Sequence, residues 1–197
     1  MTSPITRLAS AVPVTGHLVG AIEPGQWDLP TPCTDWTVRA VVNHLVLGHR
    51  RFAAALTGGT PPAPDVDLLG GDPEIAYASS SEAMLAAFRA DGALERPVTI
   101  PAGTLPGVVA CELRVVEALV HGWDLARATG RSLEFPSALV EESIAFSEEQ
   151  VGRIPADRTP FGPSQPVADD APALDRLAAL LGRSVSARPP GQSQVTA

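Results

Sequence analysis

The chain contains no lysine, and all 14 of its basic residues are arginine. This absence excludes lysine Schiff-base chemistry and a phosphate-binding loop with its usual lysine. Cysteine is also scarce, because only Cys33 and Cys111 occur, far apart and without a CxxC motif. The chain therefore offers no thiolate cage for a metal, and its cysteine usage is typical of a reducing cytosol. The sequence does not decide whether the two cysteines form a disulfide.

Long apolar runs are absent as well. No run approaches the roughly 20 residues that span a bilayer, and Pro4 and Pro13 interrupt residues 1–20, unlike a signal peptide. We therefore expect a cytoplasmic protein with no membrane partner. The formal charge of -8, without a clustered arginine face, argues against nucleic acid as a partner.

The hydrophobic pattern predicts an all-α fold. A chain of 197 residues can bury a core without a disulfide or structural metal. Apolar residues recur at helical spacing, and sustained alternation typical of strands is lacking. We expect helices over about 4–21, 37–56, 73–90, 105–128, 137–151 and 173–181, with 96–101 as a loop or edge hairpin. Pro13 predicts a kink or a late start in the first helix. The domain should span 1–183, followed by a flexible tail over 184–197.

One helical segment carries a pair of residues suited to a metal. Glu117 and His121 are four residues apart, so on a helix they lie about 40° apart and can face one atom. The pair alone is weak evidence, because Glu and His at this spacing also occur on solvated helix faces. A metal site needs at least one further ligand.

The best third ligand is His44, which has apolar neighbours along its helix and can point inward. The alternative is an ordinary core histidine with a satisfied ring. His49 lies about 140° around the same helix, so it cannot face the same metal. With Arg50 and Arg51 beside it, we expect His49 to face solvent, and we assign His17 a surface role.

Asp124 follows His121 by three residues and lies on the same stripe of the helix as Glu117. It could be a fourth ligand, an acceptor that orients a ligand histidine, or a surface carboxylate paired with Arg127 or Arg131. We favour the last two interpretations. Two nitrogens and one carboxylate on facing helices would leave coordination positions open, as in reactive rather than structural sites.

Several other residues have an ordinary interpretation that we prefer to a functional one. Trp36 and Trp123 should pack in the core or between helices rather than bind substrate. Arg39 and Arg114 could hold a substrate carboxylate, but we expect surface ion pairs. Cys33 could be a reactive thiol near a helix N-terminus, but we expect a buried structural cysteine.

Three motifs together resemble a known family. They are the stretch Pro30 to Arg39, the triplet Asn43-His44-Leu45 and the stretch Glu117 to Ala126. In combination they resemble the mycothiol-dependent maleylpyruvate isomerase N-terminal-domain family of the DinB-like superfamily. The stretch 171–183 also resembles the tail of the short actinobacterial branch of that family.

The resemblance implies a DinB-like four-helix bundle in up-down-down-up order, with extra short C-terminal helices. It implies a divalent metal, zinc first and nickel second, held by His44, Glu117 and His121. In enzymatic relatives the metal and its water activate a low-molecular-weight thiol such as mycothiol. We therefore expect a metal- and thiol-dependent transferase or isomerase acting on a small electrophile. The alternative is a non-catalytic metal-binding or interaction module of the same fold.

The resemblance also sets a limit on the activity. Two-domain isomerases of the family carry a further C-terminal α/β domain that contributes to the substrate site. This chain has no room for such a domain, so we do not expect maleylpyruvate isomerisation itself. The substrate side of the pocket must come from the bundle, from its loops or from a second subunit, since homodimers are common in the superfamily.

Overall fold

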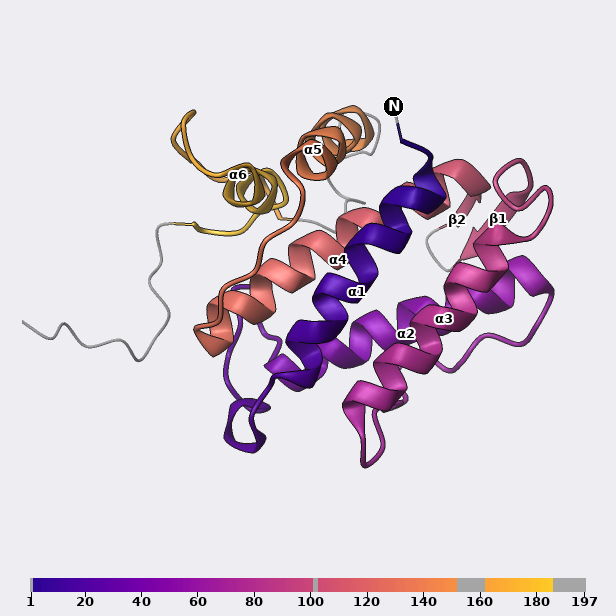
Figure 1. The fold of residues 1–197 in the computed structure, drawn as a ribbon, viewed down its shortest axis with the longest axis horizontal. Helices are drawn as coiled ribbons and strands as arrows, with labels where there is room; N and C mark the ends of the chain where they lie inside the picture. Colours follow the sequence, from indigo (N-terminus) through magenta and orange to yellow (C-terminus); the bar gives the residue numbers. More distant parts are fainter. Residues whose placement is uncertain (1, 101–102, 152–161, 186–197) are drawn as a thin grey trace, which may run out of the picture.

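The computed structural model describes residues 2–100, 103–151 and 162–185, which form an all-α fold with one β-hairpin (Figure 1). The elements in chain order are α1 (Pro4–Gly20), the short 3-10 helix η1 (Pro24–Gln26), α2 (Val38–Thr57), α3 (Pro73–Arg89), β1 (Pro97–Ile100), β2 (Gly103–Pro106), α4 (Gly107–Thr129), α5 (Ser137–Val151) and α6 (Ala173–Leu180). Each predicted helix is present, and the segment around 96–101 is the first strand of an antiparallel hairpin.

Helices α1 and α4 run parallel. Arg7 near the start of α1 pairs with Glu112, and Thr15, two turns later, donates a hydrogen bond to the carbonyl of Ala118. The order of the contacts along both helices is the same, which fixes the direction.

Helix α2 runs antiparallel to α4 and parallel to α3. His44 meets Glu117, whereas Gly48, one turn later, lies against Arg114, one turn earlier. Contacts from α2 to α3 advance in the same direction along both helices: His49 with Ser80 and Phe52 with Phe88. The four helices therefore follow the predicted up-down-down-up order.

The core lies between these four helices, and each contributes fully buried side chains, such as Leu8, Leu45, Met84 and Leu119. Helices α5 and α6 pack together against α4, outside the four-helix bundle (Figure 1). As a result α4 is covered by several neighbours, and most of its length is buried. Within the described residues, every helix is too short or too polar to cross a membrane.

The crossover, which is the connection between α2 and α3, is hydrogen-bonded to α2 at Asn43, directly before His44. The Asn43 amide donates to the carbonyl of Val66, and its oxygen accepts from the backbone N–H of Leu68 at 2.8 Å. Nearby, Arg39 pairs with Asp67 at the surface, as predicted. The crossover therefore holds the helix segment that carries His44.

Helix α1 begins at Pro4 and passes through Pro13 without a break. A late start of α1 is wrong, because Ser3 caps the helix by accepting from the N–H of Thr6 and the helix is continuous from Pro4 through Pro13. The side chain of Pro13 is exposed. Residues 186–197 of the predicted tail lie outside the described residues, so the division into domain and tail stays a prediction.

We expect the substitution Thr37→Ala to lower the free energy of unfolding by about 1 kcal/mol, because Thr37 is the N-cap of α2 and its hydroxyl accepts from the N–H of Ala40. The matched control is Thr57→Ala at the other end of α2, where the hydroxyl only back-bonds to the Ala53 carbonyl. Chemical denaturation of both variants measures the difference. Equal losses of stability would contradict the capping role.

Candidate metal centre

A closed loop precedes α2 and places Trp36 beside the histidines. The carbonyl of Trp36 accepts from both the N–H and the hydroxyl of Thr31, at 3.0 and 2.9 Å. Asp35 adopts the left-handed conformation with φ +68°, which short polar side chains tolerate. The Trp36 ring lies 4.6 Å from that of His44 and 5.8 Å from that of His121, centroid to centroid. Trp36 is thus a packing residue, but its partners are the candidate ligands.

The three predicted ligands converge. Nε2 of His44 lies 2.7 Å from Oε2 of Glu117, and Nε2 of His121 lies 3.3 Å from the same oxygen. One donor atom from each residue lies within 4.8 Å of the other two. Ligand atoms of a tetrahedral zinc ion lie roughly 3.3 to 3.6 Å apart. The separation of His121 and Glu117 already suits an ion, and that of His44 and Glu117 is shorter because a hydrogen bond joins them.

Exposure decreases steadily across the cluster. The side chain of His44 is 34% exposed, that of Glu117 18% and that of His121 4%. The centre is therefore most exposed on the His44 side, whereas His121 forms its buried end.

Asp124 orients the buried histidine. Its fully buried carboxylate accepts a hydrogen bond from Nδ1 of His121 at 3.0 Å and also binds Arg183. The interpretation as an orienting acceptor therefore agrees with the geometry. The surface alternative is wrong, because Arg127 stacks on Trp123 and Arg131 pairs with Glu23 at the surface.

The protonation preferences follow from these contacts. Burial raises the pKa of Glu117, but hydrogen bonds from His121 and His44 outweigh burial and hold this pKa well below its usual range. Burial lowers the pKa of His121, yet its hydrogen bonds to Asp124 and Glu117 produce a net rise. At His44 burial dominates and lowers the pKa despite the contact with Glu117. The centre thus presents an ionised carboxylate between His44, whose neutral form is favoured, and His121, whose proton a divalent cation would displace on binding.

Arg114 is buried beside the centre, so the predicted surface ion pair is wrong. Its side chain is 4% exposed, and Nη1 lies 3.7 Å from Oε2 of Glu117. The guanidinium occupies the space left by Gly48 and lies 5.3 Å from the ring centroid of Phe52. Its Nε and Nη2 atoms have no hydrogen-bond partner among the residues that the structure describes. Burial is possible because α4 is covered on the side that faces α2.

His49 is also buried, which contradicts the prediction that it faces solvent. Its Nδ1 lies 3.0 Å from the Ser80 hydroxyl, and its ring packs edge-on against Tyr77. Burial lowers its pKa well below the usual value, with a further contribution from Arg114. As its angle on α2 predicts, His49 does not join the candidate ligands, but its direction leads into the contact with α3.

The cysteines are both free. Cys33 is half-buried, and its sulfur lies within 4.8 Å of ligand atoms of His121 and Asp124. Burial raises the pKa of Cys33 to about 11 and that of Cys111 to about 12, so both are neutral thiols near pH 7. The proximity of Cys33 to the centre had no signal in the sequence beyond its position three residues before Trp36.

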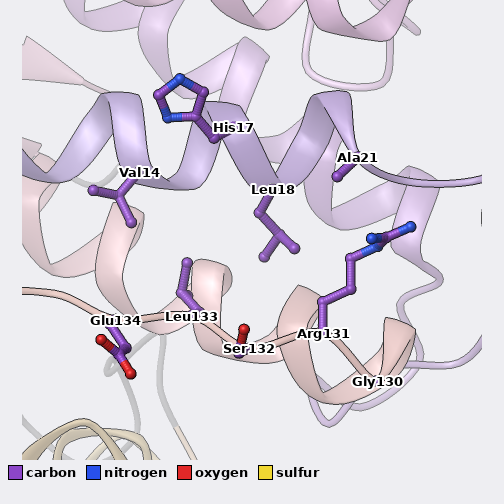
Figure 2. Close-up of a pocket in the computed structure, with 9 residues that line it drawn as sticks. All are labelled: Val14, His17, Leu18, Ala21, Gly130, Arg131, Ser132, Leu133 and Glu134. Carbon is purple, nitrogen blue, oxygen red and sulfur yellow. The ribbon is translucent and has the colours of Figure 1, made fainter.

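A separate pocket lies between α1 and the connection from α4 to α5 (Figure 2). The exposed His17 lines it together with Leu18, Arg131 and Glu134. This agrees with the surface role predicted for His17. The pocket shares no residue with the candidate metal centre, so His17 is a suitable control in experiments on that centre.

We expect Gly48→Ala to destabilise the protein by about 1–2 kcal/mol, because the new Cβ would lie 2.5 Å from Nη1 of Arg114. In an Arg114→Met background the same substitution should instead stabilise by up to ~1 kcal/mol, since alanine favours a helix over glycine. Denaturation of the four proteins of this double-mutant cycle measures the coupling. The same effect of Gly48→Ala in both backgrounds would show that the contact has no energetic weight.

Comparison with known proteins gives consistent matches. Two strains of Mycobacterium tuberculosis each have an uncharacterized protein that is 32% identical over 169 residues, covering 85% of this chain and 91% of the relative. The mycothiol-dependent maleylpyruvate isomerase structure is similar with a TM-score of 0.54 at 15% identity, covering 72% of this chain and 70% of that one. A DinB-like protein of Bacillus subtilis gives a TM-score of 0.51 at 15% identity, with coverage of 68% and 95%.

These structural similarities establish the fold, and a family model extends the relationship to the sequence. The model for the mycothiol maleylpyruvate isomerase N-terminal domain matches residues 9–126, which include all three candidate ligands. Since this match covers more than half of the chain, the protein belongs to the mycothiol maleylpyruvate isomerase N-terminal-domain family.

Proposed function

We propose that this protein binds a divalent metal through His44, Glu117 and His121 and acts with a low-molecular-weight thiol as a transferase or isomerase on a small electrophile. The observation that carries the proposal is the convergence of three donor atoms within 4.8 Å, supplied by two helices that are distant in sequence. Mycothiol is the first candidate thiol, because the isomerase with a similar fold is described as mycothiol-dependent.

The donor set favours zinc. Two imidazole nitrogens and one carboxylate oxygen are typical of zinc sites that keep a position for substrate. Imidazole also suits nickel, which is the second candidate. The hydrogen bond from His121 Nδ1 to Asp124 supports this assignment, because metal-binding histidines usually donate their other ring N–H to such an acceptor.

The thiol in this proposal comes from outside the chain. A bound divalent ion would stabilise a thiolate at neutral pH. Burial raises the pKa of both of the protein's own cysteines, which favours an external thiol, and the chain has no lysine to act as a base. Exposure at the His44 side provides the route by which thiol and electrophile would reach the donors.

The residues around the centre then have distinct tasks. Glu117 stays ionised and would bind the metal together with the two histidines, while Asp124 fixes the orientation of the His121 ring. Trp36 packs on both imidazole rings and limits the space beside them. The two free cysteines are typical of a reducing compartment, so we expect this chemistry in the cytoplasm.

Elemental analysis tests the metal directly. We expect about one Zn²⁺ per chain in the wild type, as for a mononuclear site, and loss of the metal in His44→Ala and Glu117→Ala, which each remove a ligand. His17→Ala is the matched control, because this histidine lines a different pocket. Folded wild-type protein that takes up no Zn²⁺ or Ni²⁺ on titration would contradict the metal centre.

Activity requires a separate assay. We expect metal-loaded protein to accelerate the reaction of mycothiol with a chromogenic electrophile, and His121→Ala to lower this rate by more than roughly 100-fold, since losing a ligand exceeds the usual effect of losing an outer partner. The rate of His17→Ala should equal that of the wild type. A wild type that holds its metal but is no faster than His121→Ala would instead indicate the non-catalytic module of the same fold.

A further inference from the structure

The segment that follows the family-matched region is bound to α4 around the candidate metal centre. The indole N–H of Trp123 donates to Asp175 in α6 at 2.7 Å, and Arg127 donates to the carbonyl of Val185 at 2.8 Å. Between these two contacts lies Asp124, which binds Arg183. Residues 173–185 lie beyond the match to residues 9–126, yet they contact α4 on both sides of the partner of His121.

Arg183 is held in one orientation by three hydrogen bonds. Its Nε and Nη2 donate to the two carboxylate oxygens of Asp124 at 3.3 and 2.9 Å, and Nη1 donates to the carbonyl of Leu181 at 2.9 Å. The residue is 6% exposed, and Asp124 is fully buried. Such a two-pronged arginine–carboxylate pair fixes both position and angle of the carboxylate.

The local sequence explains how Arg183 reaches the interior. Gly182, with φ +89°, ends the helical segment in the left-handed region. The N–H of Arg183 then bonds back to the carbonyl of Ala178 at 2.9 Å. Any side chain at position 182 would also lie 2.8 Å from the backbone of Gly162. The turn therefore requires glycine, and it directs the next side chain toward α4.

We propose that Arg183 is a positioning residue of the metal centre, acting through Asp124 on His121. The inference rests on the proposed metal function. One oxygen of Asp124 accepts from both Arg183 and Nδ1 of His121, so the guanidinium determines where that oxygen lies. The oxygen in turn sets the direction of the imidazole, whose Nε2 faces Glu117. Residues 173–185 are thus part of the centre, although none of them is among the proposed ligands.

The test is Zn²⁺ affinity, measured by competition with a chromogenic chelator, in Arg183→Met and Arg183→Lys. We expect Arg183→Met to weaken Zn²⁺ binding by roughly tenfold, at the lower end of the effect of outer partners. Arg183→Lys should recover only part of the affinity, because an ammonium cannot bind both oxygens in the same fork. If Arg183→Met does not fold, the partial loss in Arg183→Lys carries the test.

Two controls separate a positioning role from a general loss of packing. Arg176→Met removes an exposed ion pair between α6 and Glu141 of α5, and Asp175→Asn weakens the contact with Trp123 but leaves Asp124 untouched. Both should keep wild-type Zn²⁺ affinity. Unchanged affinity in Arg183→Met, or equal losses in Asp175→Asn and Arg183→Met, would overturn the proposal.

A second measurement distinguishes failure of this inference from failure of the metal site. Nitrogen-15 NMR of the His121 ring in metal-free protein reports its tautomer and its hydrogen bond to Asp124. We expect the ring signals to change in Arg183→Met and to stay as in the wild type in Arg176→Met. If the wild type binds no Zn²⁺, the metal function fails but this readout still tests Arg183. If Zn²⁺ binds and the ring signals do not change, the positioning role is wrong.

Discussion

The carboxylate of Glu117 is the group on which this architecture depends. A carboxylate that is mostly buried stays ionised only if nearby donors replace the water it has lost. His44 from α2 and His121 from its own helix provide those donors, and the Arg114 guanidinium lies 3.7 Å away. A single oxygen of Glu117 therefore joins α2 to α4, and the neighbouring elements serve to hold these groups in place.

Several separate parts of the chain hold the side chains around Glu117 in place. Gly48 leaves room for Arg114, and the loop ending at Trp36 packs on the imidazole rings. Asp124 accepts a hydrogen bond from Nδ1 of His121, and Arg183 in turn donates to Asp124. The acidic side chains of Glu117 and Asp124 and the basic side chains of Arg114 and Arg183 thus lie around the two imidazole rings. With both imidazoles neutral, as metal binding requires, these charges balance, so a divalent cation would bring a surplus of positive charge, which favours an anionic ligand such as a thiolate.

The sequence could predict whatever depends on nearby residues. Thr37 and Gly58 mark the ends of α2 through capping and left-handed backbone, and the spacing of Glu117 and His121 places both on one helix face. The direction of a helix face could not be predicted in the same way. His49 was expected in solvent because Arg50 and Arg51 follow it, yet its direction depends on the position of α3.

Contacts between residues that are far apart in the chain could not be predicted from the sequence. Arg114 shares the helix of Glu117, but its burial requires a glycine in α2 that no local pattern connects to it. Arg183 lies 59 residues from Asp124, and only the packing of α6 on α4 brings them together. Family motifs could indicate His44 as a candidate ligand. Motifs describe what relatives share, however, and give no information about a C-terminal segment outside the matched region.

The large separation along the chain of two candidate ligands, His44 and Glu117, links metal binding to folding. His44 and Glu117 are 73 residues apart, so a metal held by both would act as a cross-link that closes a long loop containing α3 and the hairpin. Closing such a loop restricts the unfolded chain, and the cost grows only slowly with length. A bound ion would therefore couple the assembly of the whole bundle to metal supply, and a chain that has not yet brought α4 against α2 would have no centre to fill.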